Sequence, residues 1–159
     1  MKKTAAVLLI VSALLLSACS KESKFGVEQF AQRMNSLFDA GYSTSEFMLG
    51  EDGDGGKYLM CEKDSGTVIL MIDSDSELSG VSLLVTDESK AQAALREFLE
   101  MCCVLTGNDE SSQRTVLSNC GITADSIKFT DGNSLTTVGK YKYSVISNSA
   151  SVTLFCERV

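Results

Sequence analysis

The chain has 159 residues, with 21 acidic and 14 basic side chains and a formal net charge of -7 at pH 7. An acidic protein repels the phosphates of nucleic acids, so we expect no nucleic-acid partner. Histidine is absent, which excludes Ser–His and Cys–His nucleophile pairs, histidine general bases and histidine-ligated zinc. We therefore predict that the protein is not an enzyme and carries no cofactor.

The first 18 residues have the pattern of a signal peptide. Lys2 and Lys3 give a positive start, residues 5–16 are almost wholly apolar, and no acidic residue occurs in this segment. The apolar run is too short to remain in a membrane as a spanning helix. We expect this segment to direct export and to be removed.

The signal-peptide pattern ends in Leu16-Ser17-Ala18-Cys19, which resembles the lipobox of bacterial lipoproteins. In that family the cysteine is acylated and becomes the first residue of the mature chain. A lipoprotein cysteine carries at least two acyl chains, which makes a stable anchor, whereas one chain binds only reversibly. The resemblance implies an extracytoplasmic protein, anchored to the outer face of the plasma membrane, or to an outer membrane if the envelope has one.

The predicted mature chain is more acidic than the precursor and suits a single domain. Removal of residues 1–18 takes away two lysines and no acids, so the net charge changes from -7 to -9. Residues 19–24 would be the lipidated cysteine and a linker of at most ~20 Å. Residues 25–159 would be one domain, large enough to bury about two-thirds of its unfolded surface.

The first predicted element of that domain is an amphipathic helix from Ser23 to about Ala40. Its apolar residues recur at 3.6-residue spacing, and Gly41 would end it. Strand-like runs separated by Gly, Asp and Ser clusters then indicate hairpins at residues 45–49, 57–63, 67–73 and 79–86.

Two further helices are predicted in the second half of the chain. One begins after Thr86 and ends at Gly107; a shorter one is capped by Asn108 or Asp109 and ends at Gly121. Three more strands are predicted at residues 126–130, 138–147 and 150–157. The whole pattern predicts an α+β fold of antiparallel meanders with helices packed on one face.

Short similarities between the two halves indicate a possible tandem helix-plus-three-strand repeat. Gly56-Lys57-Tyr58 parallels Gly139-Lys140-Tyr141, and Asp52-Gly53 parallels Asp131-Gly132. Such similarities also arise by chance in a glycine-rich chain, so both readings stay open. The layout is similar to that of proteinaceous β-lactamase inhibitors and small outer-membrane assembly lipoproteins, which implies an exposed sheet face that binds a protein.

The first predicted hairpin is apolar on both faces. A three-residue loop at Asp64-Ser65-Gly66 would place Tyr58, Met60, Val68, Leu70 and Ile72 on one face. The other face would then carry Leu59, Cys61, Ile69 and Met71. We predict that this second face is covered by another element or binds a partner. In the last hairpin, a two-residue loop would align Tyr141, Tyr143, Val145, Val152, Leu154 and Cys156.

Five cysteines remain once Cys19 is assigned to lipid, so at least one stays unpaired. We predict a disulfide between Cys103 and Cys120 that joins two neighbouring helices, although Cys102 could replace Cys103. The functional alternative is a thiol-based redox or soft-metal carrier that uses Cys102, Cys103 and Cys120.

Two acidic loops, starting at Asp52 and Asp73, resemble the beginning of a calcium-binding loop. A calcium-binding loop has a bidentate glutamate at position twelve. Position twelve is Lys63 in the first loop and Leu84 in the second, so we predict no metal site. The leading prediction is a lipid-anchored, non-catalytic binding or protein-interaction module.

Overall fold

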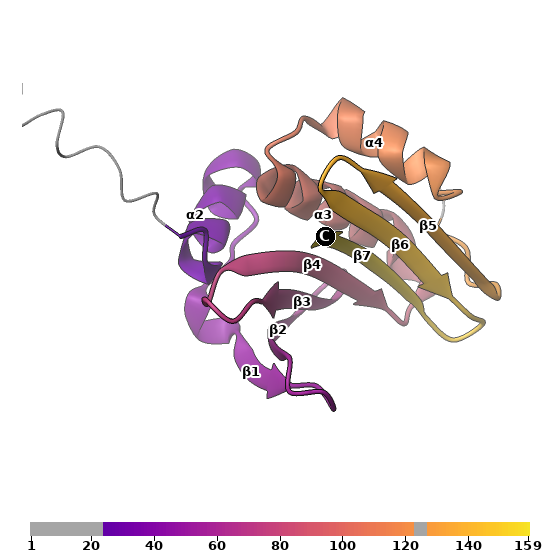
Figure 1. Cartoon of the computed structure of the whole chain (residues 1–159). Helices are drawn as coiled ribbons and strands as arrows, with labels where there is room; N and C mark the ends of the chain where they lie inside the picture. The colour runs from indigo at the N-terminus through magenta and orange to yellow at the C-terminus, as the bar shows by residue number, and fades with distance from the viewer. Residues whose placement is uncertain (1–23, 123–126) are drawn as a thin grey trace, which may run out of the picture.

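Three helices lie on one face of a seven-stranded antiparallel sheet in the computed structural model, which describes residues 24–122 and 127–159 (Figure 1). The strand order is β1-β2-β3-β4-β7-β6-β5. This arrangement confirms the predicted α+β fold. The predicted signal peptide and Cys19 lie outside the described residues.

The first half of the described chain contains α2 (Val27–Phe38), β1 (Met48–Glu51), β2 (Lys57–Lys63), β3 (Gly66–Ile72) and β4 (Leu78–Val85). The second half contains α3 (Ala91–Thr106), α4 (Glu110–Asn119), β5 (Gly132–Val138), β6 (Tyr141–Ser147) and β7 (Val152–Arg158). Short 3-10 turns occur at Thr44–Glu46 and Glu88–Lys90. Each half thus has a helix followed by three antiparallel strands, and β4 and α3 lie between the two sets.

The ends of the helices follow ordinary capping chemistry. α3 ends at Gly107, whose φ of 74° suits a residue without a side chain, as predicted. Of the two predicted caps of α4, Asn108 and Asp109, it is Asp109 that caps the helix, by accepting a hydrogen bond from the Ser112 N–H. α2 begins at Val27, later than expected, because Gly26 has an extended backbone at the N-cap.

The predicted strand at residues 138–147 was wrong. Residues 138–147 are not one strand, because a two-residue turn at Gly139 and Lys140 separates β5 from β6 and pairs Val138 with Tyr141. Gly139 has a φ of 61°, which glycine adopts without strain. Residues 127–130, predicted as strand, precede β5 instead.

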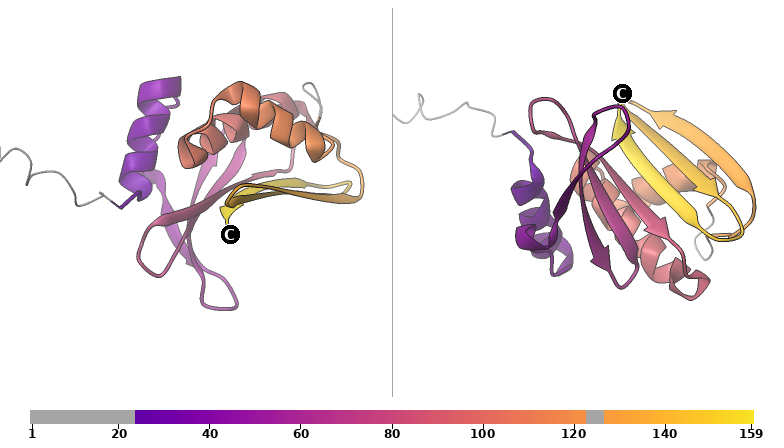
Figure 2. Two further views of the ribbon diagram at one scale, coloured as in Figure 1. Left: turned by 45° about the horizontal axis from the view of Figure 1, so that its top comes forward. Right: turned by 90° about the horizontal axis from the view of Figure 1, so that it is seen from below.

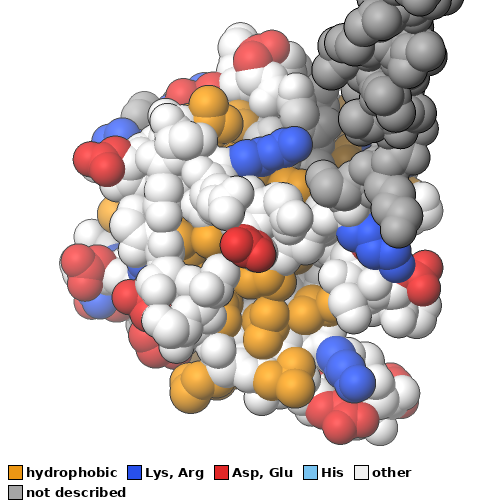
Figure 3. Space-filling view, turned by 90° about the vertical axis from the view of Figure 1, so that its left-hand side faces the viewer, with side chains coloured by type: hydrophobic (Ala, Val, Ile, Leu, Met, Phe, Trp, Pro, Cys, Tyr) orange, Lys and Arg blue, Asp and Glu red, His pale blue; other side chains and the backbone are white. Residues whose placement is uncertain are grey.

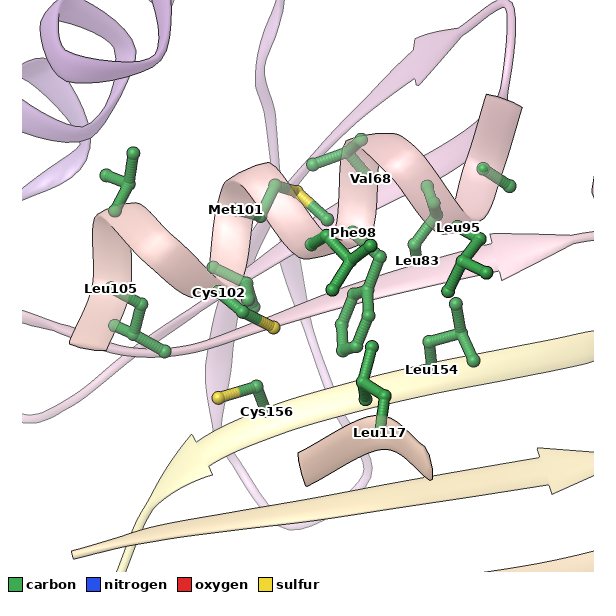
Figure 4. Packing of buried hydrophobic residues seen from close by; sticks show 14 of the residues in the cluster. Val68, Leu83, Leu95, Phe98, Met101, Cys102, Leu105, Leu117, Leu154 and Cys156 are labelled. Atoms are coloured by element: carbon green, nitrogen blue, oxygen red, sulfur yellow. The ribbon is translucent and has the colours of Figure 1, made fainter. Parts of the chain in front are cut away.

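The hydrophobic core lies between α3 and the sheet (Figure 4). Phe98 and Leu95 of α3 reach the inward side chains Leu83 of β4 and Leu154 of β7, and all of them are buried. Complete burial of a side chain such as Phe98 contributes about 1.5–3 kcal/mol. α3 therefore holds the middle of the sheet, while α2 and α4 cover its two ends (Figure 2).

The register of β2 and β3 differs from the predicted one. Lys63 pairs with Gly66, so the turn has two residues and not three. Leu59 then pairs with Leu70 and Cys61 with Val68, which places Leu59 and Cys61 on the helix side. The predicted interaction face was therefore wrong for these two residues, since one residue of loop length exchanges the faces of a strand.

In the last hairpin the predicted residues share one face, although the pairing is shifted by two residues. Tyr143 pairs with Cys156 and Val145 with Leu154, all on the helix side. The loop has four residues and not two, but an even difference in loop length leaves the alternation of side chains unchanged.

We expect a charge on β3 to be tolerated on one face and not on the other. Val68 is fully buried, so Val68→Lys should lower the free energy of unfolding by more than about 3 kcal/mol, because it buries an unpaired ammonium group. Its neighbour Ile69 faces away from the helices, so Ile69→Lys should cost about 1 kcal/mol or less. Urea denaturation measures both, and equal losses would contradict the register.

Candidate functional site

The sheet has a second face, opposite the helices, which we call the open face. Figure 2 shows it from below, with the strands in front of α3 and α4. Strand alternation places one set of apolar side chains on this face: Met48, Tyr58, Met60, Ile69, Met71, Leu84, Leu135, Ile146 and Phe155. No helix of the described chain covers them.

The apolar side chains of the open face are concentrated on β2, β3 and β4, whereas β5, β6 and β7 also carry polar side chains there, among them Lys142, Ser144 and Thr153. Met48, Leu135 and Ile146 are 57%, 59% and 47% exposed, and the side chains between them are half-buried by one another. Single exposed apolar residues are normal on protein surfaces, whereas a contiguous patch indicates a binding surface. The open face is therefore the candidate site.

A shallow hollow of about 590 Å³ lies on the open face over β2 and β3. Tyr58, Met60 and Ile69 line its floor, and the polar side chains at its rim include Asp52, Lys57, Glu62 and Thr67. Its apolar floor and charged rim match the usual anatomy of a protein interface.

Two glycines let large side chains lie flat on this face. Tyr58 pairs across the sheet with Gly50, and its ring fills the space that a side chain at Gly50 would need. The terminal methyl group of Met71 fills the corresponding space at Gly80, its partner on β4. Side chains laid over cross-strand glycines stabilise the strand pair and give a smooth apolar surface.

Ser82 is a polar group in the middle of the open face. It pairs with Ile69 on one side and Phe155 on the other, and it is only 1% exposed. Its Oγ has no hydrogen-bond partner among the described residues. A buried hydroxyl without a partner is costly, so Ser82 lowers the stability of this part of the sheet.

The helix side also has apolar groups near solvent, close to β1. A hollow of about 560 Å³ between α2 and the first strands is lined by Val27, Leu49, Leu59 and Ile72. Leu49 is 68% exposed, and Figure 3 shows apolar side chains gathered in the lower half of this side of the molecule. Leu59 thus contributes to a different surface from Ile69 and Met71, which belong to the open face.

A larger hollow, of about 670 Å³, lies between α2, α3 and the turn after β2. Two of its polar lining residues, Ser65 and Glu97, belong to a hydrogen-bonded group that also includes Tyr42. The Tyr42 hydroxyl donates to Glu97 at 2.5 Å, and the Ser65 hydroxyl donates to the same carboxylate. Burial and the Glu97 charge raise the pKa of Tyr42, so the tyrosine stays protonated and joins the two layers structurally.

The Cys103–Cys120 disulfide stays a prediction: the structure shows all five described thiols free, and Cys103 and Cys120 have different surroundings. Cys103 lies in a hollow beside Arg33 and Leu37 of α2. The Cys120 Sγ instead lies 4.0 Å from the Tyr143 carbonyl oxygen of β6.

Four of the described thiols, those of Cys61, Cys102, Cys103 and Cys120, are poor nucleophiles. Burial, followed by the nearby charges of Glu110 and Asp109, raises the pKa of Cys103 to about 11. Burial also raises the pKa of Cys61 to about 11 and that of Cys120 above its ordinary value. Thiolates bind metals and attack disulfides, so a raised pKa opposes both reactions.

Among the described residues, no group of three or more Cys, Asp or Glu side chains could hold a metal ion. The acidic loops use their carboxylates locally instead: Asp52 accepts hydrogen bonds from the N–H groups of Asp54 and Gly56, and Asp73 from those of Asp75 and Glu77. These are side-chain-stabilised turns.

No helix in residues 24–122 and 127–159 has the length and apolar character needed to cross a membrane.

Sequence reasoning placed Ile69 and Met71 on a possible interaction face but missed Tyr58, Met60 and Phe155. The available signal was Gly66, because a two-residue turn before it gives the observed register.

No protein-family model, curated protein or solved structure matches the chain.

We expect the raised thiol pKa values to make stability fall in alkali. For Cys61 and Cys103 the pKa rises from 9.0 to about 11 in the folded state, so folding favours the protonated thiol. This contribution is complete below pH 9 and is lost as pH rises towards 11, because the unfolded chain releases these protons first. Urea denaturation between pH 8 and pH 11 should show a smaller decline for the Cys61→Ala, Cys103→Ala double variant than for the unsubstituted protein. Identical declines for the two proteins would show that the Cys61 and Cys103 thiols do not cause the loss of stability.

Proposed function

We propose that this protein is a lipid-anchored, extracytoplasmic lipoprotein that acts as a non-catalytic module and binds a protein partner through its open face. The apolar segment that ends in Leu16-Ser17-Ala18-Cys19 supports the anchor. The uncovered apolar face of the sheet supports the binding role and is the observation that carries it.

The shape of the open face favours a protein over a small molecule. Small-molecule sites enclose most of the ligand's surface in a concave pocket. The hollow over β2 and β3 is open to solvent, and the apolar side chains extend beyond it to Met48 on the edge strand β1. A broad surface with an apolar centre and a polar rim fits a second protein.

Charge and side-chain type define the partner further. The acids Asp52 and Glu62 outnumber Lys57 at the rim of the hollow, and the whole chain has a net charge of -7. A partner that presents apolar side chains flanked by lysine or arginine would complement this surface. The flexible thioethers of Met60 and Met71 can adapt to such a partner.

The length of the tether places the partner near the membrane. α2 begins at Val27, eight residues after Cys19, and eight residues span at most about 28 Å when fully extended. A chain anchored at Cys19 would hold the open face within reach of membrane proteins and of envelope proteins close to the bilayer.

The alternative role, a thiol-based redox or soft-metal carrier, has less support. Cys102, Cys103 and Cys120 are all buried, and burial raises the pKa of each thiol. A carrier needs accessible thiolates, so a protein-binding role accounts better for the observed surroundings.

The anchor is tested at Cys19. We expect mass spectrometry of the mature protein to find an acylated cysteine as the first residue, and Cys19→Ala to move the protein out of the membrane fraction. Cys61→Ala, a buried-cysteine control, should leave it there. An unmodified amino terminus at any other position would refute the anchor.

The partner is tested by site-specific photo-crosslinking in intact envelopes. A photoreactive residue at Met60, on the open face, should form a crosslink to a protein whose contact peptide contains lysine or arginine. The same residue at Thr115, which is exposed on α4, should not. Ile69→Lys should reduce the Met60 crosslink at least tenfold, because it places a like charge against a basic partner.

Three outcomes would count against this partner. Equal crosslinking from Met60 and Thr115 would show no surface preference, and crosslinks only to lipid would indicate a membrane-facing sheet. Retention of the full crosslink in Ile69→Lys would show that the open face does not bind.

A further inference from the structure

The packing of α3 on β7 brings together two cysteines that are 54 positions apart in the sequence. Figure 4 shows Cys102 of α3 and Cys156 of β7 across from each other in the core. Both side chains are 0% exposed. We propose that Cys102 and Cys156 form a disulfide bond when the chain folds in the presence of a disulfide oxidant.

Two independent periodicities converge on this pair. On β7, Cys156 pairs with Val81 of β4 and Tyr143 of β6, so it points to the helix side of the sheet. On α3, Cys102 is one turn after Phe98, and both are fully buried against the sheet. The contact therefore follows from the sheet register and the orientation of α3.

The two thiols interact directly. Burial, and after it a hydrogen bond with Cys156, raises the pKa of the Cys102 thiol. The other cysteines of the described chain have different neighbours: Cys103 faces α2, and the Cys120 Sγ lies against the Tyr143 carbonyl oxygen. Cys102 is therefore the better partner for Cys156 than the adjacent Cys103.

The bond forms by thiol–disulfide exchange. A low-molecular-weight disulfide such as oxidised glutathione accepts two electrons, its S–S bond breaks, and the Cys102–Cys156 bond forms as two glutathione thiols are released. The attacking group is a thiolate, and both thiols are inaccessible in the folded protein. The reaction therefore takes place during folding, before α3 closes over the sheet.

The bond would tie α3 to the centre of the sheet and close a long loop. The enclosed segment includes α4, β5 and β6, so the disulfide restrains much of the second half of the chain in the unfolded state. The chain-entropy account predicts that oxidation raises the melting temperature by on the order of 10 °C. This inference requires neither the protein partner nor the lipid anchor.

The test is to refold the whole chain, reduced and unfolded, in a buffer of reduced and oxidised glutathione. After the free thiols are blocked, trypsin should release residues 97–114 joined to residues 143–158 by a disulfide. The first peptide contains Cys102 and Cys103, and the second contains Cys156. Cys103→Ala should keep the crosslink, and Cys156→Ala should abolish it together with the rise in melting temperature.

Other outcomes overturn the proposal. Folded protein in which Cys102 and Cys156 are both blocked, or both carry glutathione, would show that the pair does not bond. A crosslink from residues 97–114 to residues 115–128, which contain Cys120, would favour the Cys103–Cys120 bond instead. Loss of the crosslink in Cys103→Ala would show that Cys103, and not Cys102, bonds to Cys156. None of these results bears on crosslinking from Met60, so the two proposals fail separately.

Discussion

The register of the central strands is the constraint on which the rest of the structure depends. β4 pairs with β3 on one side and with β7 on the other, and every second residue of these strands contacts the helix layer. Because strand side chains alternate with a period of two, a shift of one residue would exchange the two faces. Gly66 helps to hold this register: its φ is 152°, and a Cβ there would collide with the Leu84 carbonyl group of β4.

One-sided cover by the helices explains the character of the open face. A sheet with helices on one side only must solvate its other side or bind something there. Here the uncovered side chains on β2 and β3 are largely apolar, and Tyr58 and Met71 lie over glycines of neighbouring strands. Ser82, with no hydrogen-bond partner among the described residues, lies in their midst. The chain thus keeps an apolar patch over β2 and β3 in contact with water, and burial of that patch against another surface would be favourable.

The orientation of α3 determines the surroundings of the thiols. Consecutive helix residues point about 100° apart, so Cys102 faces the sheet and Cys103 faces α2. Adjacent cysteines in the sequence therefore have unrelated neighbours in the fold. Burial protects both from ionisation, which favours a structural role over chemistry and leaves the open face as the best candidate for function.

Local patterns in the sequence determined the elements, because hydrophobic periodicity and capping residues act within a few positions. Gly107 and Asp109 marked the boundary between α3 and α4, and the α+β class followed from the order of the runs. The turn at Gly139 and the two-residue turn before Gly66 were missed, since several loop lengths fit the same letters. Only the tertiary structure decided which face the helices cover and which cysteine meets Cys156, because both depend on contacts between segments that are distant in the sequence.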